Sequence, residues 1–231
     1  SLGIKMETLN KSGIIKLIIA KNELIKHIEK TKPDIIHTQG IRADILSSII
    51  IKDLPKLCTI RNFPKIDYEM TYGKLLGNIM SFVHKTIMKK INVCVTVSDS
   101  VRNYLEKQYG IKNTVTIRNG VETNLFCKPE KDEKHYLRDK YGFSPEQKIW
   151  ITSGNLTERK NPLMIIEAFK NCFNNNDNIL IFIGNGNLEQ KCKNAVEDNK
   201  NIFFFGRVKN VVEYYKISDY YISASKAEGL P

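Results

Sequence analysis

Short apolar runs alternate with amphipathic segments along the first half of the chain. Apolar residues recur at helical spacing in three segments, and a Ser98-Asp99-Ser100 cap opens a fourth helix that runs to about residue 109. The three segments are 17–30, 43–51 and 75–90. Runs typical of buried parallel strands lie between the helices, at 35–38, 57–60, 93–97 and 115–117. This alternation predicts a parallel α/β sheet.

The second half of the chain repeats the alternation. Strands are expected at 149–152, 179–183, 202–205 and 220–223, and helices at 162–172, 188–199 and 211–216. Residues 127–140 carry many charges and few apolar side chains, so they are the best candidate for an inter-domain connection. We predict one α/β domain over 1–126, a linker over 127–147 and a second domain over 148–231. The first domain begins on a helix and the second ends just after a strand, so we expect both to be incomplete, the first without its first strand.

Composition narrows the classes of partner. The chain has 231 residues and a net charge of +11, which favours an anionic partner such as a phosphate ligand, an anionic membrane surface or nucleic acid. A plain lysine-rich composition accounts for the charge equally well. Helix-turn-helix, zinc-finger and RNP-like patterns are missing from the sequence, so no nucleic acid is expected. Five widely spaced cysteines without a CxxC pair predict reduced thiols in a cytoplasmic protein.

Polar residues at predicted strand ends are the candidates for chemistry, because open parallel sheets bind ligands there. The loop 154–161 leads into a helix whose N-terminal N–H groups, with Arg159 and Lys160, could hold a diphosphate. Taken alone, an ordinary solvated turn is the simpler interpretation. Glu228 follows the last strand on a constrained loop, where it could accept hydrogen bonds from sugar hydroxyls or simply shape a turn.

Three other strand-end features have two interpretations each. The Gly184-Asn185-Gly186 loop could approach a ligand but is more simply a tight turn. Arg207 could touch a ligand or lie on the rim, and His37 is more often a packed or capping residue than a catalytic one. The sequence has no HExxH or DxD pattern and no supported Ser-His-Asp spacing, so no metal site is predicted.

Taken together and in order, these motifs resemble glycosyltransferase family 4. The segments that resemble the C-terminal half of the family are 153–160, 184–186, 205–208, 218–219 and 225–231. Those that resemble its N-terminal half are 33–40, 97–98 and 117–121. The resemblance covers nearly the whole chain.

The resemblance implies a B-type fold, in which two Rossmann-like parallel-sheet domains face each other across a cleft. It implies a retaining, hexosyltransferase-type enzyme that moves a sugar from a nucleoside-diphosphate sugar to a sugar or lipid-linked acceptor in cell-surface polysaccharide or glycoconjugate synthesis. Domain 1–126 would be the acceptor side and domain 148–231 the donor side. No cofactor or metal is expected, since cationic groups and helix-end N–H groups can stabilise the leaving diphosphate.

The family motifs also assign roles to residues. Lys160 would neutralise the departing diphosphate, Glu228 matches the first glutamate of a paired-glutamate motif, and His37 completes the candidate catalytic set. The donor-binding candidates are Gly154, Asn155, Arg159, Gly186, Arg207 and Val208. The acceptor-side candidates are Gln39, Arg61 and Asn62, the last two in an aromatic and charged loop over 61–72. Asn155 stands where the family usually has Arg, and Gln39 where it often has His.

The surplus positive charge suggests a cytoplasmic enzyme that could sit on the inner face of an anionic membrane. Two other functions remain open at this point. One is a nucleotide-sugar epimerase or phosphorylase on the same fold. The other is a non-catalytic ligand-binding fragment.

Overall fold

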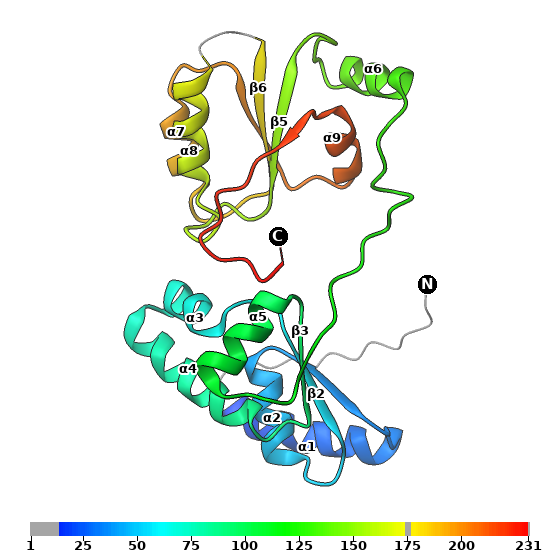
Figure 1. Ribbon diagram of the computed structural model, residues 1–231, viewed down its shortest axis with the longest axis vertical. Coiled ribbons are helices and arrows are strands. Elements are labelled where there is room, and N and C mark those ends of the chain that lie inside the picture. The colour runs from blue at the N-terminus through cyan, green and yellow to red at the C-terminus, as the bar shows by residue number, and fades with distance from the viewer. Residues whose placement is uncertain (1–13, 174–176, 231) are drawn as a thin grey trace. The chain divides into compact units, whose positions relative to one another are not determined.

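The computed structural model of the protein describes residues 14–173 and 177–230. The chain divides into two compact units. The first unit contains the described residues up to Asn119, with Gly229 and Leu230, and the second unit contains Gly120–Glu228. Each unit is built on a parallel four-stranded sheet with helices packed against it (Figure 1), which confirms the predicted α/β class.

The first unit has the strand order β1-β2-β3-β4, so each strand pairs with its neighbour in the sequence. Its strands are β1 (Ile36–Gln39), β2 (Lys56–Ile60), β3 (Val93–Thr96) and β4 (Thr114–Thr116). Its helices are α1 (Ile14–Thr31), α2 (Ile41–Ile50), α3 (Pro64–Tyr72), α4 (Lys74–Met88) and α5 (Asp99–Tyr104), which continues as a π-helical turn over Leu105–Tyr109. The Ser98 hydroxyl caps α5 by accepting from the Val101 N–H, as its sequence position predicts.

Helix α3 corrects the prediction of a loop over 61–72. Pro64 occupies the first helical turn, where its fixed φ suits the helix and its missing N–H needs no partner. Gly73, at φ 82°, then ends α3 and precedes α4, so the two helices form a hairpin. The aromatic and charged residues of this segment are therefore held on a helix.

An apolar cluster fills the first unit between β2, β3, α4 and α5. Its buried members are Cys58, Ile60, Ile87, Met88, Ile91, Cys94, Val101, Leu105, Tyr109 and Ile111. Burying each large aliphatic side chain contributes about 1.5–3 kcal/mol. The cluster holds the carboxyl ends of β2 and β3 against the helices that follow them.

The second unit has the strand order β7-β6-β5-β8. Its strands are β5 (Lys148–Ser153), β6 (Asn178–Ile183), β7 (Ile202–Gly206) and β8 (Tyr220–Tyr221), and its helices are α6 (Lys131–Lys140), α7 (Pro162–Cys172), α8 (Glu189–Val196) and α9 (Val211–Ile217). Alternate residues of β6 enter two separate apolar clusters, Leu180 and Phe182 in one and Ile179, Ile181 and Ile183 in the other. This two-residue period shows that both faces of the sheet are covered.

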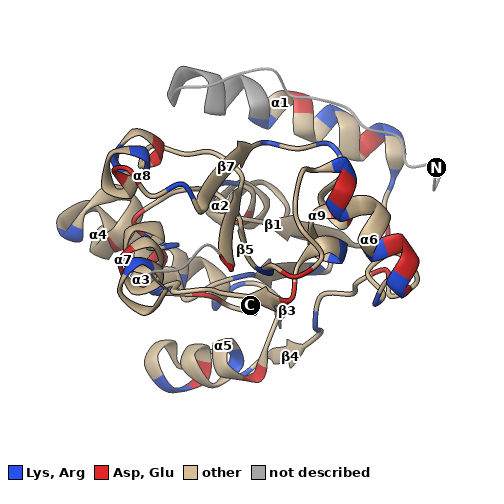
Figure 2. Ribbon diagram, turned by 90° about the horizontal axis from the view of Figure 1, so that it is seen from above, with Lys and Arg blue, Asp and Glu red and all other residues tan. Residues whose placement is uncertain are grey.

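Helix α6 lies inside the stretch 127–147 that was predicted to be a linker. It belongs to the second unit, and the two units divide at Asn119 and Gly120 rather than at residue 126. The helix carries acidic and basic residues together (Figure 2), which is why its sequence resembles a solvated connection. Its packing depends on Leu137 and on Arg138, which is only 3% exposed.

The Arg138 guanidinium is buried with a full set of partners. It donates to the carbonyl oxygens of Ile217, Pro145 and Gln147 at 2.7–3.1 Å, and it pairs with Asp219 Oδ2 at 2.7 Å. Asp219 also receives the Lys134 ammonium at 2.7 Å and the Ile149 backbone N–H at 2.8 Å. This network fastens α6 to the start of β5 and the end of α9.

Stability of the second unit is expected to fall in acid because of Asp219. Burial alone raises the pKa of this carboxyl, but hydrogen bonds from Lys134 and Ile149 and the charge of Arg138 outweigh it and hold the pKa below its ordinary value. A carboxylate with a lowered folded-state pKa stabilises the fold above its unfolded pKa of about 4, and the gain is lost as the pH falls below that.

We therefore expect Asp219→Asn to lose about 3 kcal/mol at neutral pH, since it leaves Arg138 buried without its counter-charge. The difference from wild type should shrink as the pH approaches 3 in urea-unfolding curves. If the free energies of unfolding of wild type and Asp219→Asn changed in parallel with pH, this role of Asp219 would be contradicted.

Among the described residues, no helix combines the length and the apolar character needed to cross a bilayer.

Candidate functional site

The loops that follow β5, β6 and β7 meet at the carboxyl edge of the second sheet. The Gly154 N–H donates to Ile183 O at 2.9 Å, and the Leu156 N–H donates to Asn185 O at 3.1 Å. A Cβ at position 184 would lie 2.2 Å from Gly154 O, and one at position 186 would lie 2.3 Å from Leu156 O. The glycines therefore allow two strand-end loops to touch backbone to backbone.

These loops enclose a hollow of about 400 Å³. It is lined by Ser153, Gly154, Asn155, Ile183, Gly184, Asn185, Arg207, Val208 and Val211. Four predicted donor-binding residues, Gly154, Asn155, Arg207 and Val208, thus share one cavity. Gly186 does not line it, and its contact with Leu156 gives it a role in loop packing instead.

A charged cluster adjoins this hollow. Lys160 lines a smaller recess that shares Ser153, Gly154 and Asn155 with the larger one. Lys160 Nζ lies 2.7 Å from Glu228 Oε1, and Arg159 lies 2.8 Å from the same oxygen. The prediction that this lysine and this glutamate meet in one place is confirmed by that distance.

Backbone contacts hold the cluster in position. The Arg159 guanidinium donates to Ala227 O at 3.0 Å, and the Lys226 N–H donates to Arg159 O at 2.8 Å. Gly154 has φ 136°, and a Cβ there would lie 3.3 Å from Lys160 Cε, so the glycine leaves room for the lysine side chain. Pro231, the last residue of the motif that contains Glu228, lies outside the described residues.

The electrostatics of the cluster favour an anionic ligand. Burial raises the pKa of the Glu228 carboxyl, but hydrogen bonds from Lys160 and Ser225 and the charges of Lys160 and Arg159 outweigh it and lower the pKa. The carboxylate is therefore charged at neutral pH and balances one of the two cations, which leaves the cluster with a positive charge. The side chains of Lys160, Arg159 and Glu228 are 26%, 30% and 20% exposed, so a ligand can reach them.

Helix α7 begins directly after the cluster. Asn161 adopts the left-handed conformation, with φ 52°, and Pro162 starts the helix. The N-terminal end of a helix carries a partial positive charge and favours bound phosphate. Ser223 and Ser225 add hydroxyls to the smaller recess, and neither was singled out as a ligand contact from the sequence.

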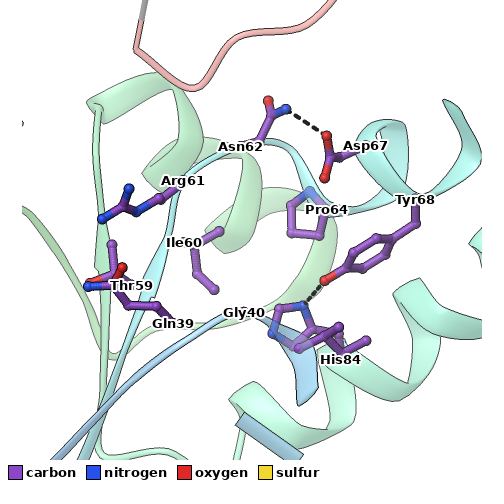
Figure 3. A pocket seen from close by; sticks show the side chains of 11 residues that line it. Gln39, Gly40, Thr59, Ile60, Arg61, Asn62, Pro64, Asp67, Tyr68 and His84 are labelled. Atoms are coloured by element: carbon purple, nitrogen blue, oxygen red, sulfur yellow. Dashed lines mark hydrogen bonds between the residues drawn. The ribbon is translucent and has the colours of Figure 1, made fainter. Parts of the chain in front are cut away.

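A second hollow of about 400 Å³ lies in the first unit, at the carboxyl ends of β1 and β2 (Figure 3). The three predicted acceptor-side residues, Gln39, Arg61 and Asn62, all line it. Asn62 Nδ2 donates to Asp67 Oδ1 at 3.0 Å, which ties the strand-end loop to α3. His37 is not among the lining residues; it is exposed on β1, and its Nε2 lies 2.7 Å from Thr59 Oγ1.

A buried polar network forms one wall of this hollow. Tyr68 OH lies 2.6 Å from His84 Nδ1, and His84 Nε2 lies 2.8 Å from Asp44 Oδ2. Asp44 Oδ1 accepts from the Thr38 hydroxyl at 2.5 Å. In the tautomer that carries its proton on Nε2, His84 donates to Asp44 and accepts from the Tyr68 hydroxyl through Nδ1.

The sequence did not identify this network as a site. Burial and the nearby charge of Asp44 raise the pKa of Tyr68, so its hydroxyl stays protonated at neutral pH. One signal was available: His84, Ser81 and Gly77 recur on the same side of the predicted helix 75–90. The same spacing is also typical of an exposed polar face, so it does not by itself show that the histidine is buried.

Among residues 14–173 and 177–230, no group of three or more His, Cys, Asp or Glu side chains is placed to hold a metal ion.

Two protein-family models match the chain. The model described as Glycosyltransferase Family 4 matches residues 5–125, and the model described as Glycosyl transferases group 1 matches residues 133–231. The gap between the two matches, residues 126–132, lies shortly after the division of the two units between Asn119 and Gly120.

Three curated relatives match most of this chain. An uncharacterized glycosyltransferase of Methanocaldococcus jannaschii is 25% identical over 94% of the chain and 56% of its own length. The UDP-Gal:alpha-D-GlcNAc-diphosphoundecaprenol alpha-1,3-galactosyltransferase of Escherichia coli is 24% identical over 95% and 59%. A capsular polysaccharide biosynthesis glycosyltransferase of Staphylococcus aureus is 26% identical over 100% and 63%. The chain thus spans between 56% and 63% of the length of these relatives.

Solved structures show the same fold at low identity. Sucrose-phosphate synthase from Thermosynechococcus elongatus superposes with a TM-score of 0.81 at 15% identity, covering 94% of this chain and 56% of that one. The Anabaena protein HepE in complex with UDP and glucose gives a TM-score of 0.73 at 14% identity, covering 91% and 56%.

Proposed function

This chain belongs to glycosyltransferase family 4 and has the B-type fold of two parallel-sheet units, and we propose that it transfers a sugar from a nucleoside-diphosphate sugar to an acceptor with retention of anomeric configuration. The names of its relatives support cell-surface polysaccharide or glycoconjugate synthesis as the setting. The observation that carries the proposal is the contact of Lys160 and Arg159 with Glu228 beside the Gly154 loop.

The chemistry of transfer matches the charges of this cluster. Breaking the bond between the anomeric carbon and the diphosphate oxygen builds negative charge on the diphosphate and positive charge on the sugar ring. Fixed cations at Lys160 and Arg159, together with the N-terminal end of α7, stabilise the departing diphosphate. The Glu228 carboxylate is suited to the hydroxyls and the developing positive charge of the sugar.

The adjoining hollow suits the rest of the donor. Its lining combines the guanidinium of Arg207, the apolar Val208 and Val211, and the backbone of the glycine loops. Such a mixture of apolar walls and a few polar groups is typical of sites for small ligands. We assign this hollow to the nucleoside, next to the cations that hold its diphosphate.

The hollow of the first unit is assigned to the acceptor. Gln39, Asn62 and Tyr68 offer amide and hydroxyl groups that hydrogen-bond to sugar hydroxyls, and Arg61 offers a cation to an acidic or phosphate-linked acceptor. Transfer forms the new bond from an acceptor hydroxyl oxygen to the anomeric carbon. With retention, the acceptor hydroxyl approaches the sugar on the same face from which the nucleoside diphosphate departs. The departing diphosphate is then the nearest base for the hydroxyl proton.

A transfer assay on the full-length protein tests this function. With a panel of nucleoside-diphosphate sugars and sugar or lipid-linked acceptors, we expect a glycoside whose anomeric configuration by NMR matches that of the donor, at a rate unchanged by EDTA. Inverted configuration would contradict retention, and an altered nucleotide sugar formed without any acceptor would point to an epimerase.

The same transfer assay, run on a variant of Arg61, tests the assignment of the acceptor site. Arg61→Ala should raise the acceptor KM by about tenfold and leave the donor KM unchanged, since a lost charged hydrogen bond costs about 1.5–3 kcal/mol. Arg102→Ala is the matched control, because Arg102 pairs only at the surface with Glu106, at 2.9 Å. If Arg61→Ala and Arg102→Ala changed the acceptor KM equally, the assignment of this hollow to the acceptor would be wrong.

A further inference from the structure

Helix α4 turns its apolar face outward. Leu75 is 80% exposed and Phe82 is 71% exposed, and Leu76, Ile79 and Val83 are exposed on the same side. Positions 75, 79, 82, 83 and 76 lie within one face of a helix, so these side chains form a continuous stripe. We call these five residues the α4 stripe.

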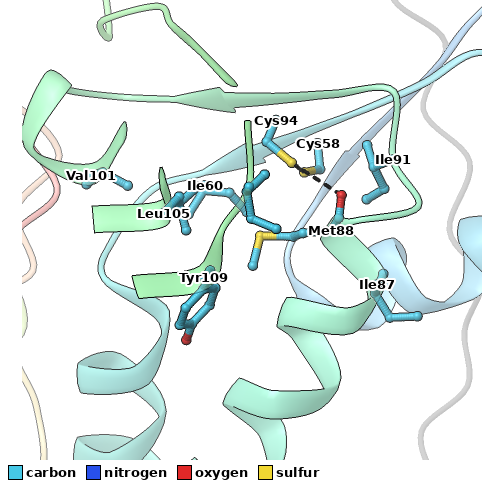
Figure 4. Close-up of a cluster of buried hydrophobic side chains, with 10 residues drawn as sticks. Cys58, Ile60, Ile87, Met88, Ile91, Cys94, Val101, Leu105 and Tyr109 are labelled. Atoms are coloured by element: carbon cyan, nitrogen blue, oxygen red, sulfur yellow. Dashed lines mark hydrogen bonds between the residues drawn. The ribbon is translucent and has the colours of Figure 1, made fainter. Parts of the chain in front are cut away.

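The opposite face of α4 already makes the contacts that anchor the helix. A Cβ at Gly77 would lie 2.6 Å from Glu69 Cα, so α4 and α3 pack backbone to backbone there. Ser81 hydrogen-bonds to Tyr109, and His84 bonds to Asp44 and Tyr68. Met88 and Ile87 reach the apolar cluster of the first unit (Figure 4). The α4 stripe is therefore not a core face of this unit, because the core is formed by the other side of the helix.

The charge around the stripe has one sign. No acidic residue occurs between Glu69 and Asp99, whereas lysines occur at positions 74, 85, 89 and 90. Lys89 and Lys90 are exposed and directly follow Met88, the last residue of α4, so two cations stand at the C-terminal end of the stripe. Helix α6, in contrast, carries both signs along its length. An apolar stripe on a helix whose own charged residues are all cations is complementary to a surface that is apolar beneath an anionic layer.

We propose that the α4 stripe and the lysines that flank it bind the surface of an anionic phospholipid bilayer. The helix lies in the plane of the interface, with Leu75, Ile79 and Phe82 at the boundary of the acyl chains and Lys89 and Lys90 at the phosphates. Ile66 and Tyr72 of α3 are exposed as well and extend the apolar area. A second copy of the chain fits this face less well, because a symmetric contact would bring the lysines of both copies together.

Vesicle sedimentation of the full chain tests this proposal. We expect binding to vesicles that contain phosphatidylglycerol and little binding to vesicles of phosphatidylcholine alone. The double variant Leu75→Ser/Phe82→Ser and the double variant Lys89→Gln/Lys90→Gln should each lower the partition coefficient by about tenfold or more. Because all four side chains are exposed, both variants should keep the wild-type unfolding midpoint.

Tyr136→Ser is the matched control, since Tyr136 is 69% exposed on α6, which belongs to the second unit. It should bind vesicles as the wild type does. Equal binding to neutral and anionic vesicles would overturn the proposal, as would wild-type binding by the two double variants. A concentration-dependent dimer that Leu75→Ser/Phe82→Ser abolishes, without any vesicle binding by wild type, would assign the face to self-association instead.

Discussion

Replacement of Lys160 by alanine is expected to lower kcat/KM for sugar transfer by about 10²–10³. Removing one fixed group that stabilises charge developing in a transition state typically slows an enzyme by about this factor. Lys160 Nζ is held 2.7 Å from Glu228 beside the glycine loop, where the diphosphate would depart. Steady-state rates with the donor identified in the transfer assay measure the effect.

A neighbouring lysine provides the control for that experiment. Lys226 lies in the segment after β8 that also carries Glu228, but its ammonium is only loosely paired with Glu158, at 3.7 Å, and is half exposed. Lys226→Ala should keep a kcat/KM close to that of wild type. A similar loss in both variants would mean that the general positive potential, not the position of Lys160, supports transfer.

Replacement of Glu228 by glutamine is expected to separate binding from chemistry. The amide removes a negative charge that now balances Lys160 and Arg159, so a nucleoside diphosphate should bind as tightly as before or more tightly. Under the proposed assignment the sugar would lose the carboxylate that faces its developing positive charge, so kcat should fall by about 10². Calorimetric titration with the diphosphate and steady-state kinetics measure the two effects.

The exposed carboxylate of Glu158 gives the matching control. Glu158→Gln changes the net charge equally but leaves the cluster intact, since Glu158 contacts only Lys226 among these side chains. Glu158→Gln should change neither the affinity for the nucleoside diphosphate nor kcat appreciably. If Glu228→Gln weakened diphosphate binding and left kcat unchanged, Glu228 would serve only to position the two cations.

The convergence of the strand-end loops in the second unit was largely predictable from the sequence, because the order of the elements along the chain determines it. In a parallel sheet every strand ends at the same edge, so the loops after β5, β6 and β7 had to converge. Gly154, Arg207 and Lys160 belong to those loops, and the structure brings them to adjoining recesses. Gly186 is the exception, because a glycine that lets loops touch has the same sequence signature as one that approaches a ligand.

Elements that pack through polar groups were not predictable in the same way. Helix α6 docks through the buried Arg138 guanidinium, and helix α3 carries charges and aromatics without a clean apolar stripe. In α4 the relation between periodicity and burial is reversed, with His84 inside and Phe82 outside. Hydrophobic spacing predicts such a helix correctly but assigns its faces the wrong way round.

The most direct test of the central claim compares a nucleoside diphosphate with its unphosphorylated nucleoside. Under the proposed assignment, the nucleoside would contact only the hollow near Arg207, whereas the diphosphate would also reach Lys160 and Arg159. Calorimetric titration of the full-length protein should therefore show much tighter binding of the diphosphate, and Lys160→Ala should remove most of that difference while leaving nucleoside affinity unchanged. If the diphosphate kept its full advantage in the variant, the cluster around Lys160 would not be the diphosphate site.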